Sequence, residues 1–590
     1  MNNSNDVFEK YDISIVKSKR NNIDSLKVNN LYLHSRYNPI EEAEKISSSH
    51  YKKNYLHILF GFGLGYIAHA LEKKMSDTDQ LLIIEPNIEL FNKAIERKEN
   101  QSFINNNKVK ICVGLDASKL EILLNSNFQS FFGRFTIISS PNYTKLYPDY
   151  YKCFLEKAKE HLMMEVINNN TRHIFSERWQ DNFISNLYPA FLAYNLEVVK
   201  GKLDCPVIIT SGGPSLTKQL PLLKKMKDHA YVICAGSTIN TLLNENIIPD
   251  LIVTVDGGEP NFNHFKDIDI DHIPLAYPLI VHKGIPLQHK GEHIIFNISD
   301  HTKTNIWTNK LLSKNITLVQ TGHSVANFSL DIALQITSGP ICIIGQDLAY
   351  SNNQTHAIGN VGFSIIDEAQ KKQRKMFITE GYYGDDVLTD YVFHGMKKGF
   401  EHQINIFKEK GCNQNIYNAT EGGVKIQGFE QISFINFIEQ FCKKNVREEV
   451  NKLLPPKEIP NSEKWKEFYN EIQKLLNQYK DVLLLTEKSL SILNKVKKNN
   501  FQFNSKFNKK IDEYDKELKV LLENEFIHYI LKPTLFKIHH SYLESEDESC
   551  EDSNKRIYHQ SYMLYEGIKT ATQQGLNWLT DLIKRVEINL

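Results

Sequence analysis

The stretch Ile208-Ile209-Thr210-Ser211-Gly212-Gly213-Pro214-Ser215-Leu216 joins an apolar run to two glycines and a proline, and it decides the fold of the central part of the chain. Val207–Thr210 is typical of a buried parallel strand, and Pro214 suits the first helical position because its missing N–H needs no partner there. We therefore predict a tight turn from strand to helix. The glycines let a ligand approach the backbone, so Ser215 and the helix N-terminus are predicted to bind a phosphate. A tight turn without a ligand is the alternative.

Downstream, further strand-like runs also end in small or polar residues. Ligands of open parallel sheets bind outside the carboxyl ends of the strands, so these loops are expected to line one crevice. Asp256 is suited to a ribose hydroxyl or a metal, and capping of the Asp-Gly turn is the alternative. Hydroxyl, amide and carboxylate groups together suit a phosphorylated, polyhydroxylated ligand. The predicted binding residues are Gly212, Gly213, Pro214, Ser215, Ser237, Thr238, Asp256, Gly257, Gly258, Thr321, Gly322, Ser324, Gly345 and Gln346.

Strand and helix signals also alternate in the N-terminal part of the chain. A strand over Tyr55–Phe60 leads into Gly61-Phe62-Gly63-Leu64-Gly65, and a later strand, Leu81–Ile84, ends in Glu85. This spacing resembles a dinucleotide or S-adenosylmethionine fingerprint, in which the acidic residue binds ribose hydroxyls. The pattern predicts a parallel sheet, and it makes a methyltransferase a rival function.

Length and patterning predict an α/β protein with two Rossmann-like parallel-sheet domains in tandem followed by an α-helical C-terminal domain. The 590 residues suffice for three domains. Beyond about residue 445 the strand signal ends and apolar residues fall at helical spacing. We place the domains at 1–180, 181–444 and 445–590.

Composition restricts the partners. Lys plus Arg and Asp plus Glu each number 70, so no overall charge favours nucleic acid or an anionic membrane. The eight cysteines form no C-x-x-C pair, which argues for a reducing cytoplasm and against structural zinc. The sequence contains no run of 18 apolar residues of the kind that spans a membrane. We expect a cytoplasmic protein without stable membrane insertion, and a homo-oligomer stays open.

Five motifs in order resemble the motility accessory factor family of bacterial flagellin glycosyltransferases. The central part is also similar to bacterial sialyltransferases, which share a Gly-Pro-Ser turn, a Thr/Ser-Gly loop and a Gly-x-Asp-x-x-Tyr segment. Some pterin pyrophosphokinase-like proteins share the first turn. The five motifs are Gly212–Leu216, Asp256–Gly258, Gly322–Ala326, Gly345–Tyr350 with Thr355-His356, and Asn418–Gly423.

The resemblance implies transfer of a nonulosonic acid, such as pseudaminic or legionaminic acid, from its CMP-activated form to Ser or Thr of flagellin, in support of flagellar assembly and motility. Flagellin and the CMP-sugar are then the expected partners. No cofactor is required, because CMP already carries the leaving phosphate. The chain has Asp256-Gly257-Gly258 in place of the Asp-x-Asp signature of metal-dependent sugar transferases. Magnesium at Asp256 is compatible with its carboxylate but is not expected.

Such a reaction needs a group that stabilises the departing phosphate and a base that deprotonates the acceptor hydroxyl. Tyr350 fits the first role by the sialyltransferase pattern, and His356 is our candidate base because imidazole titrates near neutral pH. Asp347 is a further catalytic candidate, and His323 and His394 are rivals for the base. A methyltransferase, a non-catalytic flagellin-binding factor and a pyrophosphokinase that uses ATP with magnesium are the alternative functions.

Overall fold

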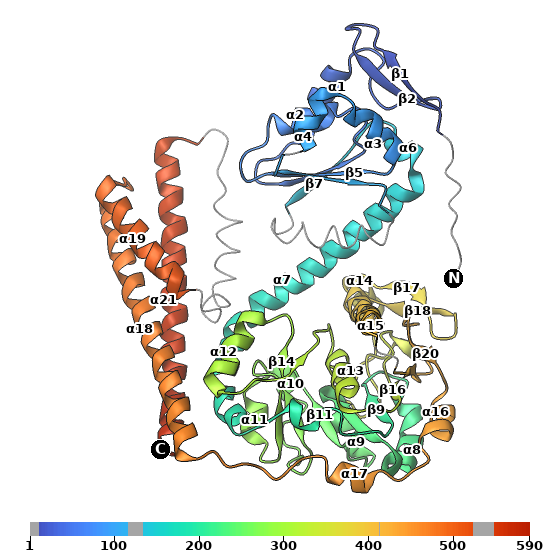
Figure 1. Ribbon diagram of the computed structural model, residues 1–590, viewed down its shortest axis with the longest axis vertical. Coiled ribbons are helices and arrows are strands. Elements are labelled where there is room, and N and C mark those ends of the chain that lie inside the picture. Colours follow the sequence, from blue (N-terminus) through green and yellow to red (C-terminus); the bar gives the residue numbers. More distant parts are fainter. Residues whose placement is uncertain (1–10, 105, 116–133, 412–413, 523–547) are drawn as a thin grey trace. The chain divides into compact units, whose positions relative to one another are not determined.

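The computed structural model describes residues 11–104, 106–115, 134–411, 414–522 and 548–590 (Figure 1). The chain divides into two compact units, residues 1–169 and 170–590. The division falls within one long helix, α7 (Pro148–Phe191). The predicted central and helical C-terminal ranges both lie in the second unit.

Unit 1 contains a four-stranded parallel sheet in the order β6-β5-β4-β7. Its central strand β4 (Leu56–Phe60) is buried at every position, as expected of a parallel strand covered on both faces. The other strands are β5 (Gln80–Glu85), β6 (Val109–Val113) and β7 (Phe135–Ser139). Besides the start of α7, the described residues of this unit form the helices α1 (Pro39–His50), α2 (Tyr66–Glu72), α3 (Ile88–Ile95), α4 (Lys98–Ile104) and α6 (Tyr143–Leu146). A small antiparallel sheet, β1 (Ile13–Lys17), β2 (Asp24–Val28) and β3 (Leu31–Tyr32), precedes them.

Unit 2 is built on a nine-stranded sheet in the order β20-β19-β16-β9-β10-β11-β12-β13-β8, and every adjacent pair in it is parallel. The central strands are β9 (Val207–Thr210), β10 (Tyr231–Ala235), β11 (Leu251–Val253) and β16 (Ile341–Ile344). The outer strands are β8 (Tyr194–Asn195), β12 (Leu275–Tyr277), β13 (His293–Ile295), β19 (Ile416–Asn418) and β20 (Glu430–Gln431). Strands β14 (Asn297–Ile298) and β15 (Leu318–Val319) form a separate parallel pair.

Successive side chains of the sheet strands lie alternately in two hydrophobic cores. Ile208 belongs to the core that contains α8 (Leu216–Met226) and α9 (Ile239–Asn244). Ile209, its neighbour, belongs to the core that contains α13 (Val325–Ile336) and α15 (Tyr391–Glu409). Because successive strand residues point to opposite faces, helices cover both faces of this sheet, as in doubly wound folds.

Three C-terminal helices extend the first of these cores. They are α18 (Ser462–Lys498), α19 (Ser505–Leu521) and α21 (Cys550–Glu587). Phe468 stacks on Phe191 of α7 with ring centroids 4.3 Å apart, and Gln180 of α7 donates a hydrogen bond to the Tyr479 hydroxyl. These contacts join the start of α18 to the sheet-bearing part of the unit.

The predicted fold class is confirmed: two parallel α/β sheets lie in series and helices follow them. Across the part of the chain that the structure describes, every helix is too short or too polar to cross a bilayer.

Candidate functional site

The order in which the chain adds strands to this sheet reverses at the boundary between β9 and β16. From β9 it adds β10 to β13 on one side, and β16, β19 and β20 then follow on the other. Such a switch point leaves a crevice at the carboxyl ends of the two neighbouring strands, where ligands of open α/β sheets bind. The predicted Gly212–Ser215 turn follows β9, and Gly345, Gln346 and Asp347 follow β16. The structure therefore brings these two groups of predicted residues together.

Asp347 lies at this switch point, directly after Gln346. Its buried carboxylate accepts hydrogen bonds from the Ser215 hydroxyl (2.7 Å), from the Ser215 backbone N–H (3.2 Å) and from the Ser351 hydroxyl (3.2 Å). Burial raises the pKa of Asp347 to about 6, although these hydrogen bonds act in the opposite direction. The carboxylate thus lies beside the start of α8, where a phosphate was predicted. A phosphate that binds Ser215 has to displace Asp347 from these donors.

Asp347→Asn is expected to remove part of the pH dependence of stability. The folded-state pKa of about 6 lies above the ordinary 3.8, so the folded protein holds this proton more tightly than the unfolded chain. The carboxyl therefore lowers the free energy of unfolding as the pH rises through this window, by about 3 kcal/mol at 1.36 kcal/mol per pH unit. The stability difference, wild type minus variant, should fall by about this amount between about pH 4 and pH 7 in urea denaturation. Parallel curves for the two proteins would contradict it.

Glycines pack directly against this cluster. Gly213 donates its N–H to the Gly345 carbonyl (2.8 Å), and a Cβ at Gly213 would overlap the Asp347 carboxylate. Gly345 has φ +67°, and a Cβ there would overlap the Ser211 carbonyl. Gln346 also contributes, because its side-chain oxygen accepts the Ser211 hydroxyl at 2.6 Å. The absence of a side chain at Gly213 and Gly345 therefore lets these two loops pack closely against each other.

Gly212 faces a different set of side chains. A Cβ there would lie 2.9 Å from Asn360 Nδ2, 3.4 Å from Thr238 Oγ1 and 3.6 Å from the His356 ring. Asn360 donates to the Ser237 carbonyl at 2.7 Å, which ties the loop after β10 to the segment that carries His356. Thr238 is fully buried, and its hydroxyl has no hydrogen-bond partner among the described residues. Predicted residues Gly212, Ser237 and Thr238 thus share one wall of the crevice with His356.

His356 has the geometry of a base. Its Nδ1 lies 2.9 Å from the Gly362 carbonyl, which can only accept, so Nδ1 carries the proton and Nε2 is left as an acceptor. Burial lowers the pKa of His356, and the positive charge of Arg374 lowers it further, against the Gly362 hydrogen bond. The imidazole is therefore neutral at neutral pH. The next residue, Ala357, donates its N–H to the Gly212 carbonyl at 2.9 Å, which holds this segment over the β9 turn.

Tyr350 lies in a polar cluster of its own. Its hydroxyl donates to Asp390 Oδ2 (2.5 Å) and accepts from Arg374 Nη1 (2.9 Å). Burial and the neighbouring Asp390 carboxylate raise the pKa of Tyr350, so it stays a protonated phenol. A leaving phosphate would therefore have to compete with Asp390 and Arg374 for the Tyr350 hydroxyl.

A family model and a solved structure match this arrangement. Residues 181–353 match the family described as 6-hydroxymethylpterin diphosphokinase MptE-like. This part of the chain is similar to that family. The MAf glycosyltransferase from Magnetospirillum magneticum AMB-1 has the same fold, with a TM-score of 0.57 at 12% sequence identity over 99% of this chain and 93% of that one. The predicted resemblance to the motility accessory factor family is confirmed at the level of domain and fold. The curated proteins contain no match to the sequence.

The remaining predicted residues of the central range lie in neighbouring loops. Asp256 is exposed after β11, and its carbonyl accepts from Asn261 Nδ2 at 2.7 Å. A Cβ at Gly257 would lie 2.6 Å from the Ile280 carbonyl, so this glycine serves close packing, and Gly258 begins α10 (Glu259–Phe262). The hydrogen bonds of the described residues do not join this loop directly to Asp347.

Thr321, Gly322 and Ser324 precede α13. Ser324 and Asn327 form a capping box at the start of that helix, and Thr321 donates its N–H to the Ser299 hydroxyl at 3.1 Å. Their contacts within the described residues are with this capping region rather than with the Ser215–Asp347 cluster. Pro214 is buried in the turn itself.

The structure adds His264, which the sequence did not single out, and it gives a contact for Thr420 of the last motif. His264 lies close enough to His356 for the charge of His356 to lower its pKa, although burial is the larger cause. Thr420, in the last motif, accepts the Gln346 N–H at 3.1 Å. The rival His323 is exposed beside Gly399, and His394 packs edge-on against Phe377 at 5.7 Å. His264 had no signal in the sequence beyond its residue type.

The glycine loop of unit 1 is filled by the protein's own side chains. A Cβ at Gly61 would overlap the Tyr143 ring, one at Gly63 would lie 2.5 Å from the His34 ring, and one at Gly65 would lie 2.5 Å from Asn100. The positions at which a cofactor would approach the backbone are therefore occupied.

Glu85, the predicted ribose ligand, is also engaged inside unit 1. It is fully buried and accepts from the Tyr143 hydroxyl (2.7 Å), the Phe62 N–H (2.9 Å) and the Asn87 N–H (3.0 Å). Burial raises the pKa of Glu85 despite these bonds. The fingerprint thus serves packing here, which weakens the methyltransferase alternative.

Tyr143→Phe is expected to destabilise unit 1 by about 1–3 kcal/mol, because it leaves a buried acceptor on Glu85 without its phenol donor. Urea denaturation measures the change. Tyr55→Phe in the same unit is the matched control, since the described hydrogen bonds leave the Tyr55 hydroxyl unused, and its effect should be near zero. Equal effects of the two substitutions would contradict the role given to Tyr143.

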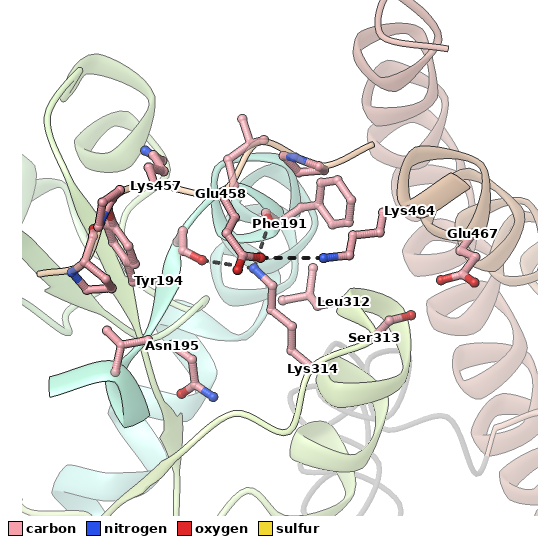
Figure 2. Close-up of a pocket in the computed structure, with 16 residues that line it drawn as sticks. Phe191, Tyr194, Asn195, Leu312, Ser313, Lys314, Lys457, Glu458, Lys464 and Glu467 are labelled. Carbon is pink, nitrogen blue, oxygen red and sulfur yellow. Dashed lines mark hydrogen bonds and ion pairs between the residues drawn. The ribbon is translucent and has the colours of Figure 1, made fainter. Parts of the chain in front are cut away.

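A second cavity, about 420 Å³, lies in unit 2 at the sheet edge formed by β8 (Figure 2). Figure 2 shows Lys314 directed at the end of α7, where its ammonium donates to the carbonyls of Phe191 (2.8 Å) and Ala193 (2.9 Å). Burial, with Lys464 and Lys457, lowers the pKa of Lys314 to about 8. Because Lys314 holds the C-terminus of α7 and β8 is five strands from β9, this cavity is separate from the switch-point crevice.

Proposed function

We propose that the chain is a Maf-type glycosyltransferase that moves a nonulosonic acid from its CMP-activated donor to a Ser or Thr hydroxyl of flagellin. The observation that carries this proposal is the neutral imidazole of His356, with its Nε2 free among the described hydrogen bonds, at the switch point of a chain that has the fold of a Maf glycosyltransferase. We place the reaction in the cytoplasm, without an added cofactor.

The proposed step exchanges one bond for another at the anomeric carbon. The acceptor oxygen forms a bond to that carbon as the bond to the phosphate oxygen breaks, and CMP leaves with the electron pair. The acceptor proton passes to His356 Nε2. The Tyr350 phenol, if released by Asp390, and the Ser215 hydroxyl, if released by Asp347, are the donors available to the departing phosphate.

Exposed apolar side chains on the His356 segment support a polypeptide acceptor. Phe363 and Ile365 lie on the strand-like stretch that pairs back onto residues 354 and 355, and they are 38% and 68% exposed. Solvent-exposed apolar patches next to a site are typical of surfaces that bind proteins. Other exposed apolar residues between 358 and 392 are Ile358, Val361, Ile378, Tyr383 and Val392.

The mass of flagellin from cells with and without this protein tests the proposal. Loss of one or more nonulosonic acid masses in the deletion strain is the expected result, restored by the wild-type gene and not by His356→Ala. An unchanged flagellin mass would contradict the proposal. Restoration by the variant would point to a non-catalytic flagellin-binding factor.

A pterin diphosphokinase is the second candidate, because the matched family model is described by that activity. It predicts that the protein converts ATP and a hydroxymethyl pterin to AMP and the pterin diphosphate in the presence of magnesium. AMP formation that depends on the pterin would favour this candidate. We expect none.

A further inference from the structure

The Arg374 guanidinium is bound to the described part of the protein through one of its nitrogens. It follows α14 (Glu368–Gln373), and its Nη1 donates to the Tyr350 hydroxyl and lies 3.8 Å from Asp390 Oδ2. Tyr350 and Asp390 are buried, and Asp390 is fixed by the Phe393 N–H at 2.9 Å. The guanidinium is therefore anchored at one corner on a rigid support.

The rest of this guanidinium is available. The Arg374 side chain is 49% exposed, and the hydrogen bonds of the described residues leave its Nε and Nη2 without a partner. Its charge reaches His356, whose pKa it lowers. A planar pair of free N–H groups matches a carboxylate in geometry and charge.

We propose that Arg374 binds the carboxylate of the sugar donor. This inference rests on the proposed function. In a nonulosonic acid the carboxylate is bonded directly to the anomeric carbon that the acceptor oxygen attacks. A receptor for that carboxylate must therefore lie beside the groups that act on this carbon. Arg374 donates at 2.9 Å to the hydroxyl of Tyr350, the predicted partner of the phosphate that leaves the same carbon.

The phosphate of the donor is the competing anion, since it is attached to the same carbon. The two are separable because CMP carries the phosphate and lacks the carboxylate. If Arg374 binds the carboxylate, its loss should weaken binding of the CMP-sugar and leave binding of CMP unchanged. If Arg374 binds the phosphate, its loss should weaken binding of CMP and of the CMP-sugar by the same factor.

Calorimetric titration of the full chain with CMP-pseudaminic acid, CMP-legionaminic acid and CMP tests the assignment. Arg374→Ala should weaken binding of the CMP-sugar that the wild type binds by about 10- to 100-fold, the usual range for hydrogen bonds to a charged group. Its affinity for CMP should stay within about twofold, which also shows that the crevice is folded. Arg374→Lys, which keeps the charge without the planar fork, should give an intermediate loss.

Lys372→Ala is the matched control, because Lys372 is an exposed cation on α14 and should leave both affinities unchanged. Equal weakening of CMP and CMP-sugar by Arg374→Ala, or no weakening at all, would overturn the carboxylate assignment and leave the proposed function standing. A wild-type protein that binds neither CMP-sugar would overturn the proposed function and this inference together.

Discussion

His356→Ala is expected to lower the rate of sugar transfer about 10²- to 10⁴-fold, the usual contribution of a positioned general base. The reason is the position of His356 at the switch point, where the Gly362 carbonyl holds Nδ1 and Nε2 is left to accept a proton. Initial rates of transfer to flagellin measure the effect. Donor affinity should be unchanged, since His356 acts on the acceptor.

The pH profile gives a second readout for His356. Burial and Arg374 lower the pKa of His356 from its ordinary 6.5, so the wild-type rate should fall only below that pH, when the base becomes protonated. His323→Ala is the control variant and should retain transfer. If His323→Ala abolished transfer while His356→Ala kept it, the assignment of the base would be wrong.

Gly423→Ala is expected to cost about 2–4 kcal/mol of folding stability. Gly423 has φ +72°, and a Cβ there would overlap the backbone of Asp347. The left-handed backbone alone costs a residue with a Cβ about 1–2 kcal/mol, and the overlap with backbone atoms adds to it because they cannot rotate away. Urea denaturation measures the loss, and a shifted Asp347 should also weaken CMP binding.

Gly201→Ala is the control that separates the cost of backbone strain from the cost of steric overlap in Gly423→Ala. Gly201 has φ +64°, and a Cβ there would meet nothing within 4 Å. The control should therefore lose only the about 1–2 kcal/mol of backbone strain. Equal losses in the two variants would show that the packing of the last motif against Asp347 contributes nothing.

The strands and turns were predictable because their signals are local. The β-branched run Val207–Thr210 was predicted as a strand and coincides with β9. The expected strand over Tyr55–Phe60 contains β4, and that over Leu81–Ile84 lies within β5. Runs of this kind are recognisable because they are apolar on both faces and end in glycine or polar residues.

The partners of the site residues were not predictable, because they lie far apart in the sequence. The Ser215 N–H was expected to meet a phosphate, whereas it donates to Asp347, 132 residues later. Tyr143 fills the loop at Gly61, although strands β5, β6 and β7 separate the two residues in the chain. Arg374 carried no signal, since an arginine after a short polar helix is ordinary. Such pairings follow from strand order, which a single sequence does not encode locally.

Incubation of purified unglycosylated flagellin with this protein and a CMP-nonulosonic acid tests the central claim most directly, with intact mass as the readout. We expect a mass increase by whole nonulosonic acid residues, matched by release of CMP and strongly reduced with His356→Ala. Unchanged flagellin mass with both CMP-pseudaminic acid and CMP-legionaminic acid, in protein that folds and binds CMP, would contradict the account.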